Sequence, residues 1–201
     1  MIKFFGAPMS SSGRTRWMLE EVGVPYEYTV VNLHDEEARR RYLEIFPGGK
    51  VPYLVDGDVK LFESMAINFY LAERYGPELL PRDLELRAQV YQWSFWSITN
   101  LQPEALKYMG HGAFAPDDER GVRHKDEARA SCRRYLDQLE TSLTGRYLVG
   151  DSFTVADVNC GSIVNLTQRA NVGVGPKVAE WMDTLRGRPA WKRASQEVSL
   201  R

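Results

Sequence analysis

The sequence predicts an α/β domain followed by an all-helical domain, and three observations support this division. Short β-branched, alternating segments separate helical segments over residues 1–76. The following stretch GPELLPRD contains two prolines and no hydrophobic periodicity, which is typical of a linker. Beyond residue 84, apolar residues recur at helical spacing. We therefore expect a first domain at residues 1–78, a linker at 79–84 and a helical domain at 85–201.

The first domain is predicted to alternate strands and helices. A helix that opens at Glu63-Ser64 and stops at Gly76-Pro77 ends the domain, and Asp56-Gly57-Asp58 forms a hairpin turn before it. The order β-α-β-α-β-β-α implies a parallel pair at the start and an antiparallel pair at the end. The other predicted elements are strands at residues 2–5, 26–33, 51–55 and 59–62 and helices at 13–22 and 35–46.

The second domain is predicted to contain only helices. A long helical stretch runs from about residue 84 to 109, and Pro103 should bend or split it. Thr154 and Asp157 have the spacing of a capping box, with Asp157 in a structural role at the start of a very apolar helix. The remaining elements are a loop at residues 108–116, a helix at 117–142 and a pair of helices near 176–186 and 189–194.

Composition and charge argue against several function classes. A formal net charge of −1 gives no electrostatic footprint for nucleic acid or an anionic membrane. No apolar run approaches the roughly 20 residues that span a bilayer, and the N-terminal residues lack the apolar core of a signal peptide. Cys132 and Cys160 are far apart and lack metal-ligand spacing, so both should be reduced. We expect a soluble cytoplasmic protein without a metal.

Residues 46–76 carry two features that point to ligand binding. Pro52 stands at the start of a predicted strand, and X–Pro bonds are the peptide bonds that adopt the cis form. A cis bond there would turn the backbone N–H and C=O of Val51 outward, towards an extended peptide ligand. Ser64 stands at a helix N-terminus, where unpaired N–H groups and the helix dipole attract a carboxylate or a phosphate.

Lys50-Val51-Pro52, the hairpin and Glu63-Ser64 resemble the glutathione-binding half of a cytosolic glutathione S-transferase of the serine-type, bacterial-like kind. The Thr154-x-x-Asp157 element resembles the one before a buried helix in the C-terminal domain of that family, so the resemblance covers essentially the whole chain. It implies a thioredoxin-like first domain that binds glutathione as a co-substrate. It also implies an α-helical bundle that contacts a small hydrophobic electrophile, and a homodimer.

The resemblance assigns the glutathione contacts residue by residue. The main chain of Val51, next to Pro52, would pair with the cysteinyl backbone, and Lys50 would reach the glycyl carboxylate. Ser64 would take the α-carboxylate of the γ-glutamyl end, and Glu63 would face its ammonium group. A solvated lysine and an ordinary helix cap are the alternative interpretations of these residues. A second contact to the glycyl end is left open between His34, Arg39 and Arg40.

A serine between the first strand and the first helix is expected to stabilise the glutathione thiolate. Members of the family use Ser, Tyr or Cys at this point, and the chain has no Cys in residues 1–79 and no Tyr before Tyr26. A hydroxyl that donates to a thiolate lowers a thiol pKa that is ordinarily about 8.5. The family pattern favours Ser10, four residues before Arg14, with Ser11 as a serious rival and Ser12 as a lesser one. All three serines can instead serve as turn and capping residues.

The second substrate should be apolar, because aromatic residues lie on the long helix of the second domain and after it. Trp96 and Tyr108 are the residues expected to contact it, although such a stripe can equally belong to the core or to a dimer contact. The leading hypothesis is a transferase that conjugates or reduces hydrophobic electrophiles with a serine-stabilised glutathione thiolate. The alternatives are a glutathione-binding protein without turnover and a scaffold that binds partner proteins.

Overall fold

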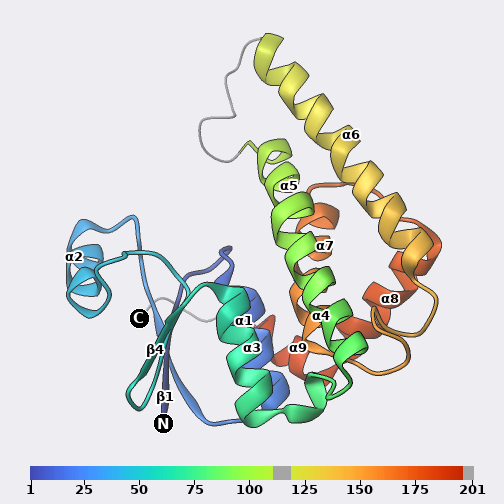
Figure 1. Ribbon diagram of the computed structural model, residues 1–201. Coiled ribbons are helices and arrows are strands. Elements are labelled where there is room, and N and C mark those ends of the chain that lie inside the picture. The colour runs from blue at the N-terminus through green and yellow to red at the C-terminus, as the bar shows by residue number, and fades with distance from the viewer. Residues whose placement is uncertain (111–118, 197–201) are drawn as a thin grey trace. The chain divides into compact units, whose positions relative to one another are not determined.

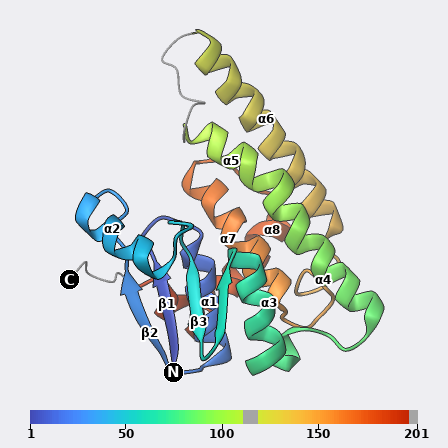
Figure 2. The same ribbon diagram turned by 60° about the vertical axis from the view of Figure 1, so that its left-hand side comes forward.

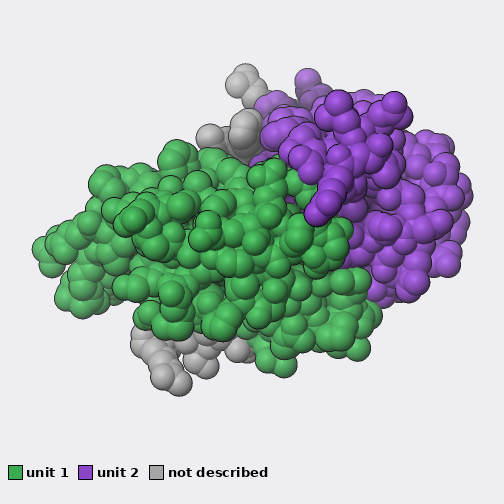
Figure 3. Space-filling view, turned by 60° about the horizontal axis from the view of Figure 1, so that its bottom comes forward, with its two compact units in different colours: residues 1–80, 187–201 green, residues 81–186 purple. Residues whose placement is uncertain are grey.

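The computed structural model describes residues 1–110 and 119–196, with the side chains of 119 and 120 excepted. By its internal contacts the chain divides into two compact units (Figure 3). The first comprises residues 1–80 together with residues 187–201, and the second comprises residues 81–186. Among the described helices, none combines the length and the apolar character that crossing a bilayer requires.

The first unit is a mixed four-stranded sheet with helices on both faces. The strands lie in the order β2-β1-β3-β4. The parallel β1–β2 pair and the antiparallel β3–β4 pair are as predicted, and β1 pairs with β3 antiparallel. Helix α2 lies on one side of the sheet, and α1 and α3 lie on the other (Figures 1 and 2). The strands are β1 (Ile2–Gly6), β2 (Tyr26–Val30), β3 (Tyr53–Asp56) and β4 (Val59–Phe62), and the helices are α1 (Ser12–Val22), α2 (Glu36–Ile45) and α3 (Ser64–Tyr75).

Adjacent residues of β1 build the two halves of the core, because successive side chains of a strand point to opposite faces. Phe4 is fully buried and its ring stacks on Tyr28 of β2 with centroids 4.9 Å apart. Phe5 faces the other way, into a cluster that includes Tyr42 of α2 and Tyr53 of β3. The α2 side of the sheet therefore has an aromatic core of its own.

Two strands differ from their predicted limits by two residues or more at one end. β2 ends at Val30 instead of three residues later, because Asn32 turns the chain: its side-chain oxygen accepts a hydrogen bond of 3.1 Å from the backbone N–H two residues on. β3 begins at Tyr53 instead of Val51, because Pro52 has no N–H to donate to a neighbouring strand. The residues before β3 are thereby kept out of the sheet.

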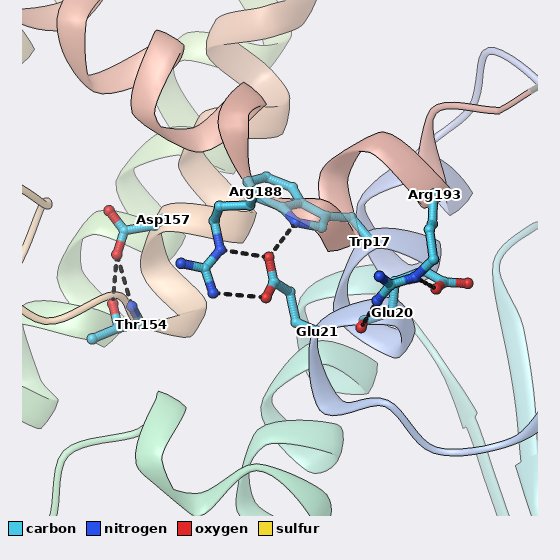
Figure 4. A network of polar contacts seen from close by, with 7 residues as sticks. All are labelled: Trp17, Glu20, Glu21, Thr154, Asp157, Arg188 and Arg193. Atoms are coloured by element: carbon cyan, nitrogen blue, oxygen red, sulfur yellow. Dashed lines mark hydrogen bonds and ion pairs between the residues drawn. The ribbon is translucent and has the colours of Figure 1, made fainter.

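The C-terminal helix α9 (Pro189–Ala194) belongs to the first unit, although the sequence analysis grouped residues 187–201 with the helical domain. Its contacts with α1 explain this placement. Trp191 packs edge-on against Trp17 with ring centroids 4.5 Å apart. Arg188 binds the Glu21 carboxylate through two hydrogen bonds of 2.7 and 2.8 Å, and the indole N–H of Trp17 donates to the same carboxylate at 2.7 Å (Figure 4).

The second unit is helical throughout its described residues. Before it, Pro77–Leu79 forms a short 3₁₀ turn, η1. The long stretch is split before Pro103, as predicted: the N–H of Gln102 donates to the carbonyl of Ser97 five residues back, in a π-helical turn. The predicted loop at 108–116 and the predicted helix start at Asp117 fall largely outside the described residues. The elements are α4 (Leu84–Trp96), η2 (Ser97–Leu101), α5 (Gln102–Tyr108), α6 (Glu119–Ser142), α7 (Val155–Arg169) and α8 (Pro176–Gly187).

The predicted capping box at the start of α7 is confirmed, and its carboxylate is fully buried. Asp157 accepts hydrogen bonds from the N–H and the hydroxyl of Thr154 at 2.8 and 3.1 Å (Figure 4). It also accepts from the N–H of Leu148 at 3.0 Å and from the indole of Trp181 at 2.9 Å. Burial raises the pKa of Asp157, and the four donors oppose that rise. The carboxylate thus ties α7 to α8 and has a structural role.

We predict that Arg188→Ala destabilises the protein more than Arg193→Ala does. The side chain of Glu21 is only 6 % exposed, so losing Arg188 leaves a buried carboxylate with fewer donors, at a cost of about 1–3 kcal/mol. Arg193 pairs with Glu20 at 2.6 Å but is 50 % exposed, and such pairs contribute up to about 1 kcal/mol. Urea unfolding of both variants measures the difference, and equal losses would contradict it.

Candidate functional site

Three segments of the first unit bring the predicted residues together. These are the turn between β1 and α1, the residues before β3, and the N-terminus of α3. The hydroxyl of Ser11 lies 3.5 Å from the carbonyl oxygen of Val51, across 40 residues of sequence. A guanidinium nitrogen of Arg14 lies 3.5 Å from the hydroxyl of Ser64. The Val51–Pro52 peptide bond is cis, as predicted from the sequence.

Two of the three candidate serines hold the turn between β1 and α1. Ser10 Oγ lies 2.7 Å from the carbonyl of Ala7 and 2.8 Å from Ser12 Oγ, and it accepts from the N–H of Ser12 at 3.1 Å. Ser12 is buried, and its Oγ accepts from the N–H of Ala7 at 3.3 Å. A hydroxyl has one proton, and the proton of Ser10 already has acceptors within the turn. Gly6 permits this packing, since a Cβ there would lie 2.8 Å from the Cβ of Ser12.

Ser11 has a different environment. It stands at the N-cap position of α1, is half-buried, and makes no side-chain capping bond. The contact of its hydroxyl with Val51 is at the long limit of hydrogen bonding and is therefore weak. The positive end of the α1 dipole lies at the same place. Of the three serines, Ser11 is the one whose hydroxyl points to the segment predicted to bind the cysteinyl residue.

The N-terminus of α3 has the electrostatic character of an anion site. Ser64 is its first residue and is 3 % exposed, with the buried Arg14 beside it. Unpaired N–H groups, the helix dipole and the guanidinium all favour a negative charge at this point. Glu63, just before, is exposed and has φ 68° and ψ 113°, in a region that favours glycine. Such a conformation costs roughly 1–3 kcal/mol, and strained residues of this kind concentrate at ligand sites.

The residues expected at the glycyl end of the ligand are exposed. The side chain of Lys50 is free to reach a ligand, while its backbone carbonyl accepts a hydrogen bond of 2.7 Å from the hydroxyl of Tyr42. His34, Arg39 and Arg40 are also exposed, before and within α2. No signal in the sequence marked the hydroxyl of Tyr42 as part of this region.

The two aromatic residues predicted to meet the electrophile lie in the second unit. Trp96 is half-buried, packs edge-on against Trp93 and Tyr135, and donates its indole N–H to Gln138 at 3.3 Å. Tyr108 is half-buried at the last residue of α5. Trp96 thus has packing partners within the helical unit. Its contact with an electrophile, like that of Tyr108, stays a prediction.

Neither cysteine is exposed to act as a nucleophile. Cys132 and Cys160 are both buried, on α6 and α7. Burial raises the pKa of Cys132 to about 11, so its thiol stays neutral at physiological pH. Within residues 1–110 and 119–196, no three His, Cys, Asp or Glu side chains gather as a possible metal site.

Comparison with known proteins identifies the family. The model of the Glutathione S-transferase, N-terminal domain matches residues 1–73, and that of the Glutathione S-transferase, C-terminal domain matches residues 105–189. The chain belongs to the glutathione S-transferase family of enzymes. Its fold is that of the family, a thioredoxin-like domain followed by a helical domain, as the sequence predicted.

Full-length relatives and solved structures agree with this membership. Glutathione S-transferase F10 of Arabidopsis thaliana is 37 % identical over 216 residues, covering 100 % of this chain and 99 % of the relative. Disulfide-bond oxidoreductase YfcG of Escherichia coli is 30 % identical, covering 100 % and 97 %. The theta class glutathione S-transferase of Xanthomonas axonopodis pv. citri, solved with glutathione bound, superposes with a TM-score of 0.83 at 27 % identity, over 100 % and 99 % of the two chains.

Proposed function

We propose that this member of the family is an active transferase that uses glutathione as its co-substrate. Glutathione binds to the first unit, where Ser11 stabilises its thiolate, and the thiolate attacks a hydrophobic electrophile. The observation that carries the proposal is the placement of the Ser11 hydroxyl 3.5 Å from the Val51 carbonyl, at the N-terminus of α1. Relatives named as glutathione S-transferases over their full length, and a structural neighbour with bound glutathione, support it.

Each part of glutathione has a chemically suitable partner in this proposal. An extended cysteinyl residue pairs with the main chain of Val51, which brings its sulfur beside the Ser11 hydroxyl. The γ-glutamyl carboxylate lies at Ser64, and Glu63 faces the ammonium group. Lys50 faces the glycyl carboxylate. The hydroxyl and the dipole of α1 favour the thiolate over the thiol, and each unit by which the thiol pKa falls corresponds to about 1.4 kcal/mol.

The reaction is the transfer of the glutathione sulfur to an electrophilic centre. With an electrophilic carbon, a C–S bond forms and the leaving group departs, or an epoxide ring opens. With a peroxide or a disulfide, the O–O or S–S bond breaks and a second glutathione completes the reduction. The name of the Escherichia coli relative adds disulfides to the candidate substrates. Because Cys132 and Cys160 are buried, the reducing thiol in that case is that of glutathione.

The proposal includes two statements about the cellular form of the enzyme. It is a homodimer, as the family resemblance implies, and it acts in the cytoplasm. The nearly neutral net charge supports the view that neither nucleic acid nor an anionic membrane is its partner. Trp96 and Tyr108 are proposed to contact the electrophile.

We predict that glutathione stabilises the wild-type protein and that the bound thiol reacts. A ligand at ~100 times its dissociation constant adds about 2.7 kcal/mol to the free energy of unfolding. Thermal unfolding with millimolar glutathione measures this, and a panel of an aryl halide, an epoxide, a hydroperoxide and a disulfide measures turnover. Stabilisation without turnover would favour a binding protein. No stabilisation would contradict both interpretations and favour a scaffold.

We predict that Ser11→Ala raises the pKa of the bound glutathione thiol, whereas Ser10→Ala leaves it near the wild-type value. Losing one hydrogen bond to a charged group costs about 1.5–3 kcal/mol, which corresponds to a rise of about one to two pKa units. The rate near neutral pH should fall roughly tenfold or more, with recovery at higher pH. The ultraviolet absorbance of the thiolate as a function of pH measures the shift. The opposite pattern would return the role to Ser10.

We predict that Ser64→Ala weakens glutathione binding by about 1–3 kcal/mol and leaves the thiol pKa unchanged, because Ser64 meets the carboxylate and not the sulfur. Ser162→Ala is a matched control, since Ser162 is a half-buried serine of α7 whose hydroxyl donates to a backbone carbonyl at 2.8 Å. Calorimetric titration with glutathione gives both affinities. An unchanged affinity in Ser64→Ala would remove this residue from the site.

A further inference from the structure

Tyr42 connects α2 to the segment that leads into β3. Its side chain is 3 % exposed, and its hydroxyl donates to the backbone carbonyl of Lys50 at 2.7 Å. Burial raises the pKa of the phenol, so it remains a protonated donor at physiological pH. The ring packs against Phe5 and Phe46, with centroids 6.0 and 6.4 Å away. The hydrogen bond closes the segment of residues 43–49, which comprises the last turn of α2 and the residues that follow it.

This hydrogen bond fixes the orientation of one peptide group. The carbonyl of Lys50 and the N–H of Val51 belong to the same planar unit, and in a trans peptide they point in opposite directions. The bond between these residues is trans, because the cis bond lies one position later. A carbonyl held by the buried hydroxyl of Tyr42 therefore directs the N–H of Val51 away from the α2 core. No described residue accepts a hydrogen bond from that N–H, although Val51 is half-buried.

The hydrogen bond from Tyr42 to Lys50 matters because α2 has one buried residue with which to attach to the sheet. Of the ten residues of α2, all of them described, Tyr42 is the buried one. Beside it lies a pocket of about 390 Å³ that residues of the helix and of the end of β2 line together, Val31 and Ile45 among them. The helix is therefore not close-packed along this flank, and Tyr42 is the residue of α2 that is buried and hydrogen-bonded to the segment before β3.

We propose that Tyr42 is a positioning residue of the glutathione site. It acts through the Lys50 carbonyl to present the N–H of Val51 to the cysteinyl carbonyl of glutathione. The inference rests on the proposed function, because it assumes that glutathione pairs with Val51. It assigns to α2 a role in affinity that is separate from the stabilisation of the thiolate by Ser11.

The experiment compares Tyr42→Phe with Tyr70→Phe in the full chain. Phenylalanine keeps the ring packing of Tyr42 and removes only its hydroxyl. Tyr70 is a matched control, because its hydroxyl donates to Asp56 at 2.7 Å and is not part of the site. We expect Tyr42→Phe to raise the dissociation constant of glutathione about fivefold, the effect of one typical hydrogen bond. The turnover number and the pKa of the bound thiol should stay at their wild-type values, and Tyr70→Phe should bind as tightly as the wild type.

A spectroscopic measurement separates positioning from a purely structural role. In wild-type protein labelled with ¹⁵N, the amide proton of Val51 should shift downfield as glutathione is added, because it forms a hydrogen bond. The shift should be smaller in Tyr42→Phe and unchanged in Tyr70→Phe. An unaltered Val51 shift and affinity in Tyr42→Phe would overturn the inference, as would equal weakening in both variants. Failure of the wild-type protein to bind glutathione would instead overturn the proposed function, and this inference with it.

Discussion

The backbone just before β3 is the part of the first unit on which the site depends. A sheet satisfies the N–H and C=O groups of its strands, but Pro52 keeps the residues in front of it out of the ladder. Their polar groups must find partners elsewhere. The carbonyl of Lys50 binds Tyr42, and the carbonyl of Val51 meets Ser11 only weakly. The N–H of Val51 has no acceptor among the described residues and stands next to a weakly engaged carbonyl, so this segment is suited to an extended peptide.

Two helices start near this segment, and each brings different polar side chains to it. The N-terminus of α1 brings the hydroxyl of Ser11, which is proposed to meet the sulfur, and the N-terminus of α3 brings the buried Ser64 with Arg14 beside it. In the proposed complex, both helices present their positive dipole ends to a ligand that carries negative charge. Glu63 occupies a strained conformation immediately before α3, so the fold maintains this arrangement at a cost in free energy.

The sequence predicted those features that depend on local chemistry. Proline at a strand entry, serine at a helix start and the Thr154-x-x-Asp157 spacing each imply a geometry within a few residues, and the structure has all three. It did not predict which serine hydroxyl stays outside the hydrogen bonds of the turn, because that depends on how the turn closes: Met9 has φ 54°, and the bonds of Ser10 stay inside the turn. The pairing of α9 with α1 and the bond from Tyr42 were missed for a similar reason, since each joins segments whose meeting only the folded chain reveals.

Affinity and reactivity are therefore assigned to different structural elements. The contacts that would hold glutathione come from the segment before β3 and from α3, while the group proposed to act on its sulfur belongs to α1. The C-terminal half of α1 is tied to α9 through Glu20 and Glu21, which leaves its N-terminal turn to be shaped by its own serines. A change in one element should then alter binding without altering the thiol, or the reverse. Such separability follows from the division of the contacts among elements, and it gives each proposed residue a distinct experimental signature.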